Sequence, residues 1–280
     1  MITPKSLAAS VLALLPFAVQ ATYPFYNPGT LPGNWDASCA EHDGTVQQVT
    51  NVVYKGTTAL KMTQTYDASY TGRYHSEVDV SDGYTRGDER FYGFAFRLSE
   101  SWSFEGTQSY NIAQFIANRP GAGCGDDDWM PSSMLWLKGN QLTTRIVSGQ
   151  YTSPNCIRNF SEFGNLATVS AGAWHTVIIQ ARWNSDNTGF YKIWFDGAKV
   201  LEKYDVATTI SNDNSKFAFR VGLYANSWHD DNKMVGSQAF RQIWFDEVSV
   251  DSTYKAVDPA QLRAEHCFNL NHDIFLDVSI

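Results

Sequence analysis

The sequence predicts an all-β fold, a single-domain β-jelly roll in which two antiparallel sheets pack face to face and one face is concave. Segments of alternating apolar and polar residues, separated by turn signals, recur along the chain, which is typical of antiparallel sandwiches. Aromatic residues make up 14% of the 280 residues, and such large side chains pack well on pleated sheets. Helix signals are scarce, and the convincing one is 258–266, with Asp258 as N-cap and Pro259 at the first helical position.

The expected strands follow from this alternation. In chain order they lie at 72–80, 90–99, 110–118, 133–139, 141–148, 174–183, 189–197, 216–226 and 240–250. The pair Asp196-Gly197, which follows one strand and precedes a further apolar pair, predicts a tight hairpin. The loop at 118–133 is rich in Gly, Pro and Asp and is expected to be irregular. Its three Asp residues at 126–128 indicate a solvated acidic loop, because a calcium loop needs alternating oxygen ligands at a defined spacing.

The two ends of the chain differ from the rest. Residues 1–21 combine an early Lys, an apolar run and a small-x-small ending, which is typical of a secretory signal peptide. The remaining length suits one domain at 22–265, followed by a tail at 266–280 that has no assignable partner. No later apolar run approaches the ~20 residues of a membrane helix, so we expect a secreted, extracellular monomer without a membrane partner. The net charge of −8 argues against a nucleic-acid partner.

Four cysteines in a secreted chain predict disulfides, and four cysteines allow three pairings. We favour Cys124 with Cys156, which clips one long loop region. We also favour Cys39 with Cys267, which ties the two ends of the domain together.

Polar side chains follow one face of each of three expected strands. In the stretch GRYHSEVDV the alternation of side chains puts four ionisable residues on the same face, namely Arg73, His75, Glu77 and Asp79. In the strand at 216–226 the face opposite the apolar one carries Arg220, Tyr224 and Asn226. In the strand at 110–118 a glutamine, Gln114, shares parity with Tyr110, Ile112 and Ile116. If the three strands are neighbours on a concave sheet, these side chains line one groove.

The same three segments carry a resemblance to a known family. The segments RYHSEV, IAQF and RVGLYAN follow the order of the Arg-x-Glu, Gln-Ile-His and Lys-x-Gly-x-Tyr-Asn motifs of β-jelly-roll alginate lyases. Over most of the chain, including WHTVIIQARWNSDNTGFYKIWFDG, the sequence more closely resembles the secreted fungal glucuronan lyases. The departures from the alginate pattern favour that relative: Phe115 replaces the His, Arg220 replaces the Lys, and Ala225 separates Tyr224 from Asn226.

The resemblance implies a polysaccharide lyase that cleaves β-1,4-linked polyglucuronate by β-elimination, with an anionic polysaccharide as its partner. Gln114 is expected to neutralise the sugar carboxylate, assisted by Asn226 or Arg220. Tyr224 and His75 are expected to share the proton transfers, and the sequence leaves open which of them is the base.

A Tyr base needs a lowered pKa, which Arg73 or Arg220 nearby would provide. Arg73 is expected to meet carboxylates and Glu77 to orient its neighbours. We expect no organic cofactor, and a structural calcium ion held by Asp246 on the side of the sandwich away from the groove.

Two alternatives use the same residues differently. The run Glu77, Asp79 and Asp82 approaches the Glu-x-Asp-x-x-Glu pattern of sandwich glycosidases, in which two carboxylates flank the scissile bond. A non-catalytic carbohydrate-binding sandwich would use aromatic platforms and would not need the His, Gln and Tyr set.

Overall fold

The computed structural model describes residues 25–119, 121–125 and 128–262 of the chain. The predicted signal peptide at 1–21 and the predicted tail at 266–280 lie outside the described residues. Within the described part, no helix is long and apolar enough to cross a membrane.

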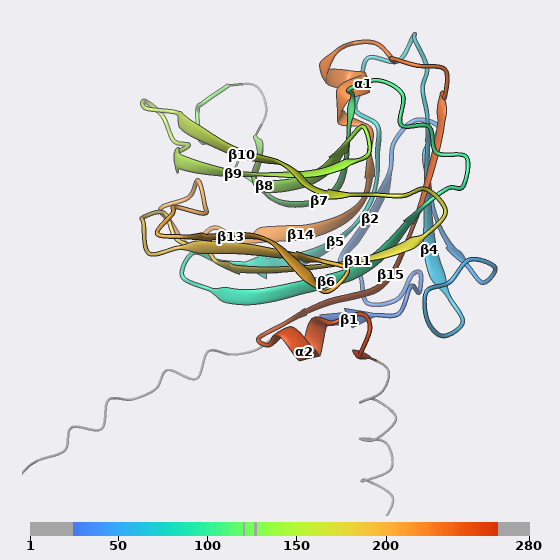
Figure 1. The fold of residues 1–280 in the computed structure, drawn as a ribbon. Coiled ribbons are helices and arrows are strands. Elements are labelled where there is room, and N and C mark those ends of the chain that lie inside the picture. Colours follow the sequence, from blue (N-terminus) through green and yellow to red (C-terminus); the bar gives the residue numbers. More distant parts are fainter. Residues whose placement is uncertain (1–24, 120, 126–127, 263–280) are drawn as a thin grey trace, which may run out of the picture.

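The described residues form two antiparallel sheets that pack on one another (Figure 1). The back sheet contains β1 (Phe25–Asn27), β3 (Thr45–Val49), β4 (Ala59–Thr65), β6 (Glu89–Leu98), β11 (Trp174–Arg182), β12 (Phe190–Phe195), β13 (Ala198–Tyr204) and β15 (Phe240–Asp251). Its order is β13-β12-β11-β6-β15-β4-β3, with β1 paired to β15. The front sheet contains β2 (Ala37–Ala40), β5 (His75–Tyr84), β7 (Ser109–Asn118), β8 (Trp129–Lys138), β9 (Gln141–Gln150), β10 (Ile157–Thr168) and β14 (Phe217–Tyr224). Its order is β10-β9-β8-β7-β14-β5-β2.

The core between the sheets is aromatic, as the composition predicts. Trp183 stacks on Tyr84 with ring centroids 3.9 Å apart, and Phe217 stacks on the same tyrosine at 4.6 Å. On β14 every second side chain, from Phe217 to Leu223, is buried in this core. Burial of each such side chain contributes about 1.5–3 kcal/mol relative to exposure, so the inward faces fix the strand orientation. The outward faces are thereby free to carry polar side chains.

The nine strands expected from the alternation are confirmed in position, and the tight turn expected at Asp196-Gly197 joins β12 to β13. Asp196 and Gly197 have φ angles of 48° and 78°, the left-handed values that the Asp-Gly pair tolerates in such a turn. Six strands are not among these nine, β1 to β4, β10 and β13, although the hairpin predicted at Asp196-Gly197 implied a partner strand where β13 lies. β2 and β10 are mostly exposed edge strands, so no apolar alternation marks them.

Two short helices were also missed. The helix α1 (Asn226–Asp230) lies at one end of the front sheet, and α2 (Tyr254–Val257) packs on the outer side of the back sheet (Figure 1). The predicted helix at 258–266 extends beyond the described residues at 262. At its start the Asp258 side chain accepts a hydrogen bond from the Ala260 backbone N–H, as expected of an N-cap.

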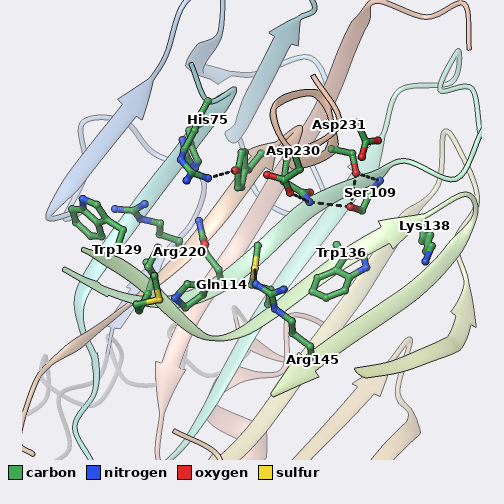
Figure 2. A pocket seen from close by; sticks show the side chains of 18 of the residues that line it. His75, Ser109, Gln114, Trp129, Trp136, Lys138, Arg145, Arg220, Asp230 and Asp231 are labelled. Carbon is green, nitrogen blue, oxygen red and sulfur yellow. Dashed lines mark hydrogen bonds between the residues drawn. The ribbon is translucent and has the colours of Figure 1, made fainter. Parts of the chain in front are cut away.

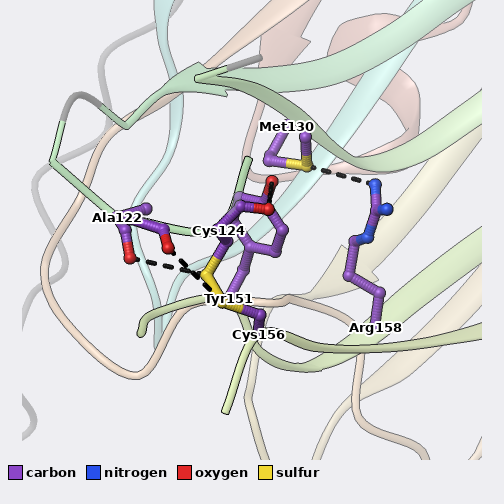
Figure 3. Close-up of a disulfide and its surroundings, with 7 residues drawn as sticks. Ala122, Cys124, Met130, Tyr151, Cys156 and Arg158 are labelled. Carbon is purple, nitrogen blue, oxygen red and sulfur yellow. Dashed lines mark hydrogen bonds between the residues drawn. A yellow bond between two sulfur atoms is a disulfide. The ribbon is translucent and has the colours of Figure 1, made fainter. Parts of the chain in front are cut away.

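The predicted Cys124–Cys156 disulfide is formed and joins two cysteines 32 positions apart, one before β8 and one before β10 (Figure 3). Its Cα atoms are 5.3 Å apart, which is within the range of ordinary disulfides. Cys39 forms no disulfide within the described residues. Its expected partner, Cys267, lies outside them, so that pairing stays a prediction.

Candidate active site

A groove of about 760 Å³ crosses the outer face of the front sheet, from β2 to β10. Side chains of seven strands and of α1 line it (Figure 2). The predicted site residues among its lining are Arg73, His75, Gln114, Arg220, Tyr224 and Asn226. The structure therefore brings the three polar stripes together on one surface.

Strand pairing explains why these stripes meet. The strands β5, β14 and β7 are neighbours, with Tyr224 paired to His75 and Arg220 paired to Gln114. One part of the prediction is wrong. Tyr110 and Ile112 do not share the face of Gln114 but lie in the core, because the register of β7 shifts between Asn111 and Ala113. This bulge turns Gln114 into the groove.

Glu77 does not line the groove but lies almost fully buried beneath the lining residues Gln114 and Arg220. Both of its carboxylate oxygens accept hydrogen bonds from Gln114 Nε2, at 2.9 and 3.0 Å, and Arg220 Nη1 lies 3.7 Å from Oε2. Its strand partner is Gly222, where a Cβ atom would lie 2.7 Å from the Glu77 Cγ. A side chain at position 222 would therefore displace the carboxylate that orients Gln114 and Arg220.

Arg220 is shared between two carboxylates. Its Nε lies 2.7 Å from Asp79 Oδ1, and its guanidinium stacks over the Trp129 ring at 4.9 Å. Burial raises the pKa of Asp79 to about 6, against the opposing effect of Arg220. The guanidinium is thus fixed in place at the groove surface.

The His75 ring is oriented by Glu41, a residue that the sequence did not indicate. His75 Nδ1 lies 2.8 Å from Glu41 Oε2, and the same oxygen accepts the His75 backbone N–H at 3.2 Å. Burial would raise the pKa of Glu41, but the hydrogen bonds from the His75 ring and backbone, with the charges of His75 and Arg73, together outweigh it and hold that pKa below its usual value. The ionised Glu41 can only accept, so Nδ1 carries the proton and Nε2 is left as a lone-pair acceptor. Nε2 lies 3.9 Å from Glu77 Oε2.

Tyr224 stacks on the His75 ring with centroids 3.9 Å apart. Its hydroxyl oxygen accepts a hydrogen bond from Arg73 Nη1 at 2.8 Å. Arg73 lowers the pKa of Tyr224, as expected, but burial has the larger effect and raises that pKa to about 12. The expectation of a lowered tyrosine pKa is therefore wrong for the free protein. Because a guanidinium cannot accept, the hydroxyl proton can point to another acceptor.

Two predicted residues have other contacts. Asn226 lies in α1 and donates from Nδ2 to Ser109 Oγ at 2.9 Å, so its amide joins the helix to β7. Asp82, the third acid of the glycosidase pattern, does not line the groove and lies 3.6 Å from Arg90. Glu77, Asp79 and Asp82 therefore do not place a pair of carboxylates in the groove as a glycosidase would need.

Asp246 lies on β15 in the back sheet, away from the groove, and is fully buried. Its Oδ2 accepts hydrogen bonds from the backbone N–H groups of Tyr54 and Lys55, each at 3.0 Å. Over residues 25–119, 121–125 and 128–262, no three His, Cys, Asp or Glu side chains gather in a way that would hold a metal ion. The expected calcium ion at Asp246 stays a prediction.

Comparison with known proteins gives a consistent result. A family profile described as polysaccharide lyase matches residues 26–249. The crystal structure of an endo-β-1,4-glucuronan lyase from the fungus Trichoderma reesei is 67% identical, with a TM-score of 0.83 over 85% of this chain and 98% of that one. A marine alginate lyase from Aplysia kurodai shares the fold at 11% identity, with a TM-score of 0.50 over 81% of this chain and 97% of that one. No curated protein matches the sequence.

Proposed function

The chain belongs to the polysaccharide lyase family, and on that premise we propose that it cleaves β-1,4-linked polyglucuronate within the chain, by β-elimination. The observation that carries the proposal is the stacked pair of His75 and Tyr224 beside fixed donors, in a protein 67% identical to an endo-β-1,4-glucuronan lyase. The reaction removes the proton on C5 of a glucuronate, next to its carboxylate, and expels the glycosidic oxygen on C4. A double bond forms between C4 and C5, conjugated with the carboxylate.

The proton on C5 becomes acidic only if the carboxylate is neutralised. Arg220 and Gln114 are suited to this, because Glu77 and Asp79 already fix them and they need not reorganise during the reaction. The same contacts explain why two acids lie beside an anion site. Each acid orients a donor, and neither is assigned to proton transfer.

His75 is our candidate base and Tyr224 our candidate acid. The geometry supports this division because Glu41 leaves His75 Nε2 as an acceptor, while the raised pKa of Tyr224 keeps its hydroxyl protonated. The proton from C5 goes to Nε2, and the hydroxyl proton goes to the leaving oxygen. The resulting imidazolium is stabilised by Glu41 and the tyrosinate by Arg73. Proton exchange with solvent then restores both groups.

Secretion, a monomeric state and a structural calcium ion at Asp246 stay predictions. In the elimination the C5–H bonding pair becomes the C4–C5 π bond and the C4–O pair leaves with the oxygen, without oxidation or reduction by another molecule, so we expect no organic cofactor.

The test is to incubate the protein with polyglucuronate and measure ultraviolet absorbance of the conjugated unsaturated product. Tyr224→Phe should lower the rate by about 10²–10⁴-fold, the usual contribution of a positioned acid, without unfolding the protein. Tyr204→Phe is a matched control, since Tyr204 lies exposed on β13 of the back sheet. New reducing ends without the absorbance would mean hydrolysis and overturn the proposal. Pectate, alginate and heparin run in parallel test the choice of polymer.

A further inference from the structure

The end of the groove formed by β9 and β10 carries two arginines far from the His75–Tyr224 pair. Arg145 projects from β9 and Arg158 from β10, and both line the groove. Figure 2 shows Arg145 beside Trp136, on the far side of Gln114 from His75. Three strand spacings separate β14 from β9, and four separate β14 from β10, which amounts to roughly 14 and 19 Å. These are distances between strand axes, and the Arg145 side chain reaches back along the groove, where its charge interacts with Tyr224.

Aromatic rings and thioethers hold these two guanidinium groups. Arg145 lies over the rings of Trp136 and Phe160, at 5.4 and 5.1 Å, and its Nη2 lies 2.9 Å from the Met134 sulfur. Arg158 lies over the Tyr151 and Phe160 rings, at 5.3 and 5.7 Å. These contacts fix the planes of the guanidinium groups without neutralising their charge.

Carboxylates do not neutralise this pair within the described part of the chain. Neither arginine forms an ion pair with a described Asp or Glu, although Glu162 of β10 is the strand partner of Arg145. Burial lowers the pKa of Arg145, and the opposing effects of Asp230, Glu162 and Tyr224 do not offset it. The chain as a whole has a net charge of −8, so these two arginines make this end of the groove locally more positive than the rest of the protein.

We propose that Arg145 and Arg158 form a distal subsite that binds the carboxylates of a polyuronate chain roughly two to four sugars from the cleaved bond. This inference rests on the proposed function and adds the direction of the chain, across β8 and β9 toward β10. Phe160, with 53% of its surface exposed, offers a face on which a sugar ring can lie.

The subsite predicts that affinity rises with substrate length. Arg158→Gln and Arg145→Gln should each raise KM for polyglucuronate about five- to tenfold, with a much smaller effect on kcat. The loss should shrink for oligomers too short to reach β9. Arg158→Lys should restore part of the affinity, because a lysine keeps the charge but not the planar group. Arg86→Gln is the control, since Arg86 is exposed, lies outside the groove and removes the same charge.

The outcomes separate the subsite from the proposed function. If wild-type protein cleaves polyglucuronate but both arginine variants match Arg86→Gln at every substrate length, the subsite is overturned and the lyase function stands. If wild-type protein does not cleave it, the proposed function fails. Calorimetric binding of polyglucuronate then decides the subsite alone, and equal affinity of the variants and the control would overturn it. Melting temperatures show whether Arg145→Gln, which removes a half-buried side chain, is folded.

Discussion

Two histidine–carboxylate pairs in this protein have the same geometry and different surroundings. In the groove, His75 Nδ1 lies 2.8 Å from Glu41 Oε2 and the ring stacks on Tyr224. In the back sheet, His175 Nδ1 lies 2.8 Å from Asp196 Oδ2 and the ring stacks on Phe195. In each pair the carboxylate fixes the orientation of an imidazole that is largely shielded from water.

The two pairs differ in the contacts of the second ring nitrogen of the histidine, Nε2. His175 Nε2 accepts the backbone N–H of Ser170 at 3.2 Å and lies 3.0 Å from the Ser170 hydroxyl, so both nitrogens are used in the fold. His75 Nε2 makes no hydrogen bond to the described residues and lies 3.9 Å from the Glu77 carboxylate. A histidine–carboxylate pair alone therefore does not identify a base. An available Nε2 beside a proton donor does.

The largest expected effect separates the two histidines. His75→Gln should lower kcat/KM by about 10²–10⁴-fold with little change in melting temperature, because it removes the proposed base. His175→Gln should keep kcat and lower the free energy of unfolding by about 1–3 kcal/mol, because buried partners lose their hydrogen bonds. Kinetics on polyglucuronate and thermal unfolding of both variants measure this. Residual activity of His75→Gln with an unchanged pH profile would instead assign both proton transfers to Tyr224.

A smaller effect is expected from the two carboxylates. Glu41→Gln should lower kcat about 10- to 100-fold, because the amide can still accept from Nδ1 but cannot stabilise the imidazolium charge. Asp196→Asn makes the same change in the back sheet and should leave kcat within a factor of about two. The decisive measurement is the pH dependence of the rate. Loss of the Glu41 charge should shift the limb of this profile that is assigned to His75. Equal loss of activity in the two variants would mean that Glu41 acts only through folding.

Much of the fold and of the groove could be predicted from the sequence because both depend on side-chain alternation. The faces of β5 and β14 follow a period of two, so the positions of His75 and Tyr224 could be read directly. Gln114 was assigned to the groove although the bulge in β7 was not foreseen, and its expected neighbours Tyr110 and Ile112 lie in the core.

Glu41 could not be predicted by the same means. It follows β2, a short and fully exposed strand without a pattern, and meets His75 only through the pairing of β2 with β5. Such a contact depends on long-range topology. Arg158 was missed for a related reason, since β10 is an exposed edge strand that was not predicted. Arg145 lies on β9, which was predicted, but its face was not identified as part of a groove.

The smallest effect concerns the pH dependence of folding stability, to which Asp79 and Asp196 should contribute with opposite sign. Burial raises the pKa of Asp79 from 3.8 to about 6. For Asp196, burial also raises the pKa, but the hydrogen bonds from His175 and the Thr176 backbone outweigh it and the pKa is lowered. A raised carboxyl pKa gives stability that is present below the unfolded value and lost as the pH rises through the folded value. A lowered one gives stability that is lost as the pH falls.

Asp79→Asn should therefore gain stability relative to wild type as the pH rises from 3.8 to about 6, by on the order of 3 kcal/mol. Asp196→Asn should show the opposite trend, with a deficit that is present near neutral pH and vanishes in acid. Its size should be only a few tenths of a kcal/mol, because the Asp196 side chain is 45% exposed and solvent screens the pair. Urea unfolding of both variants and wild type across this pH range measures the trends. Parallel plots of stability against pH for the two variants would contradict this contrast, because Asp79 would then ionise as readily as Asp196.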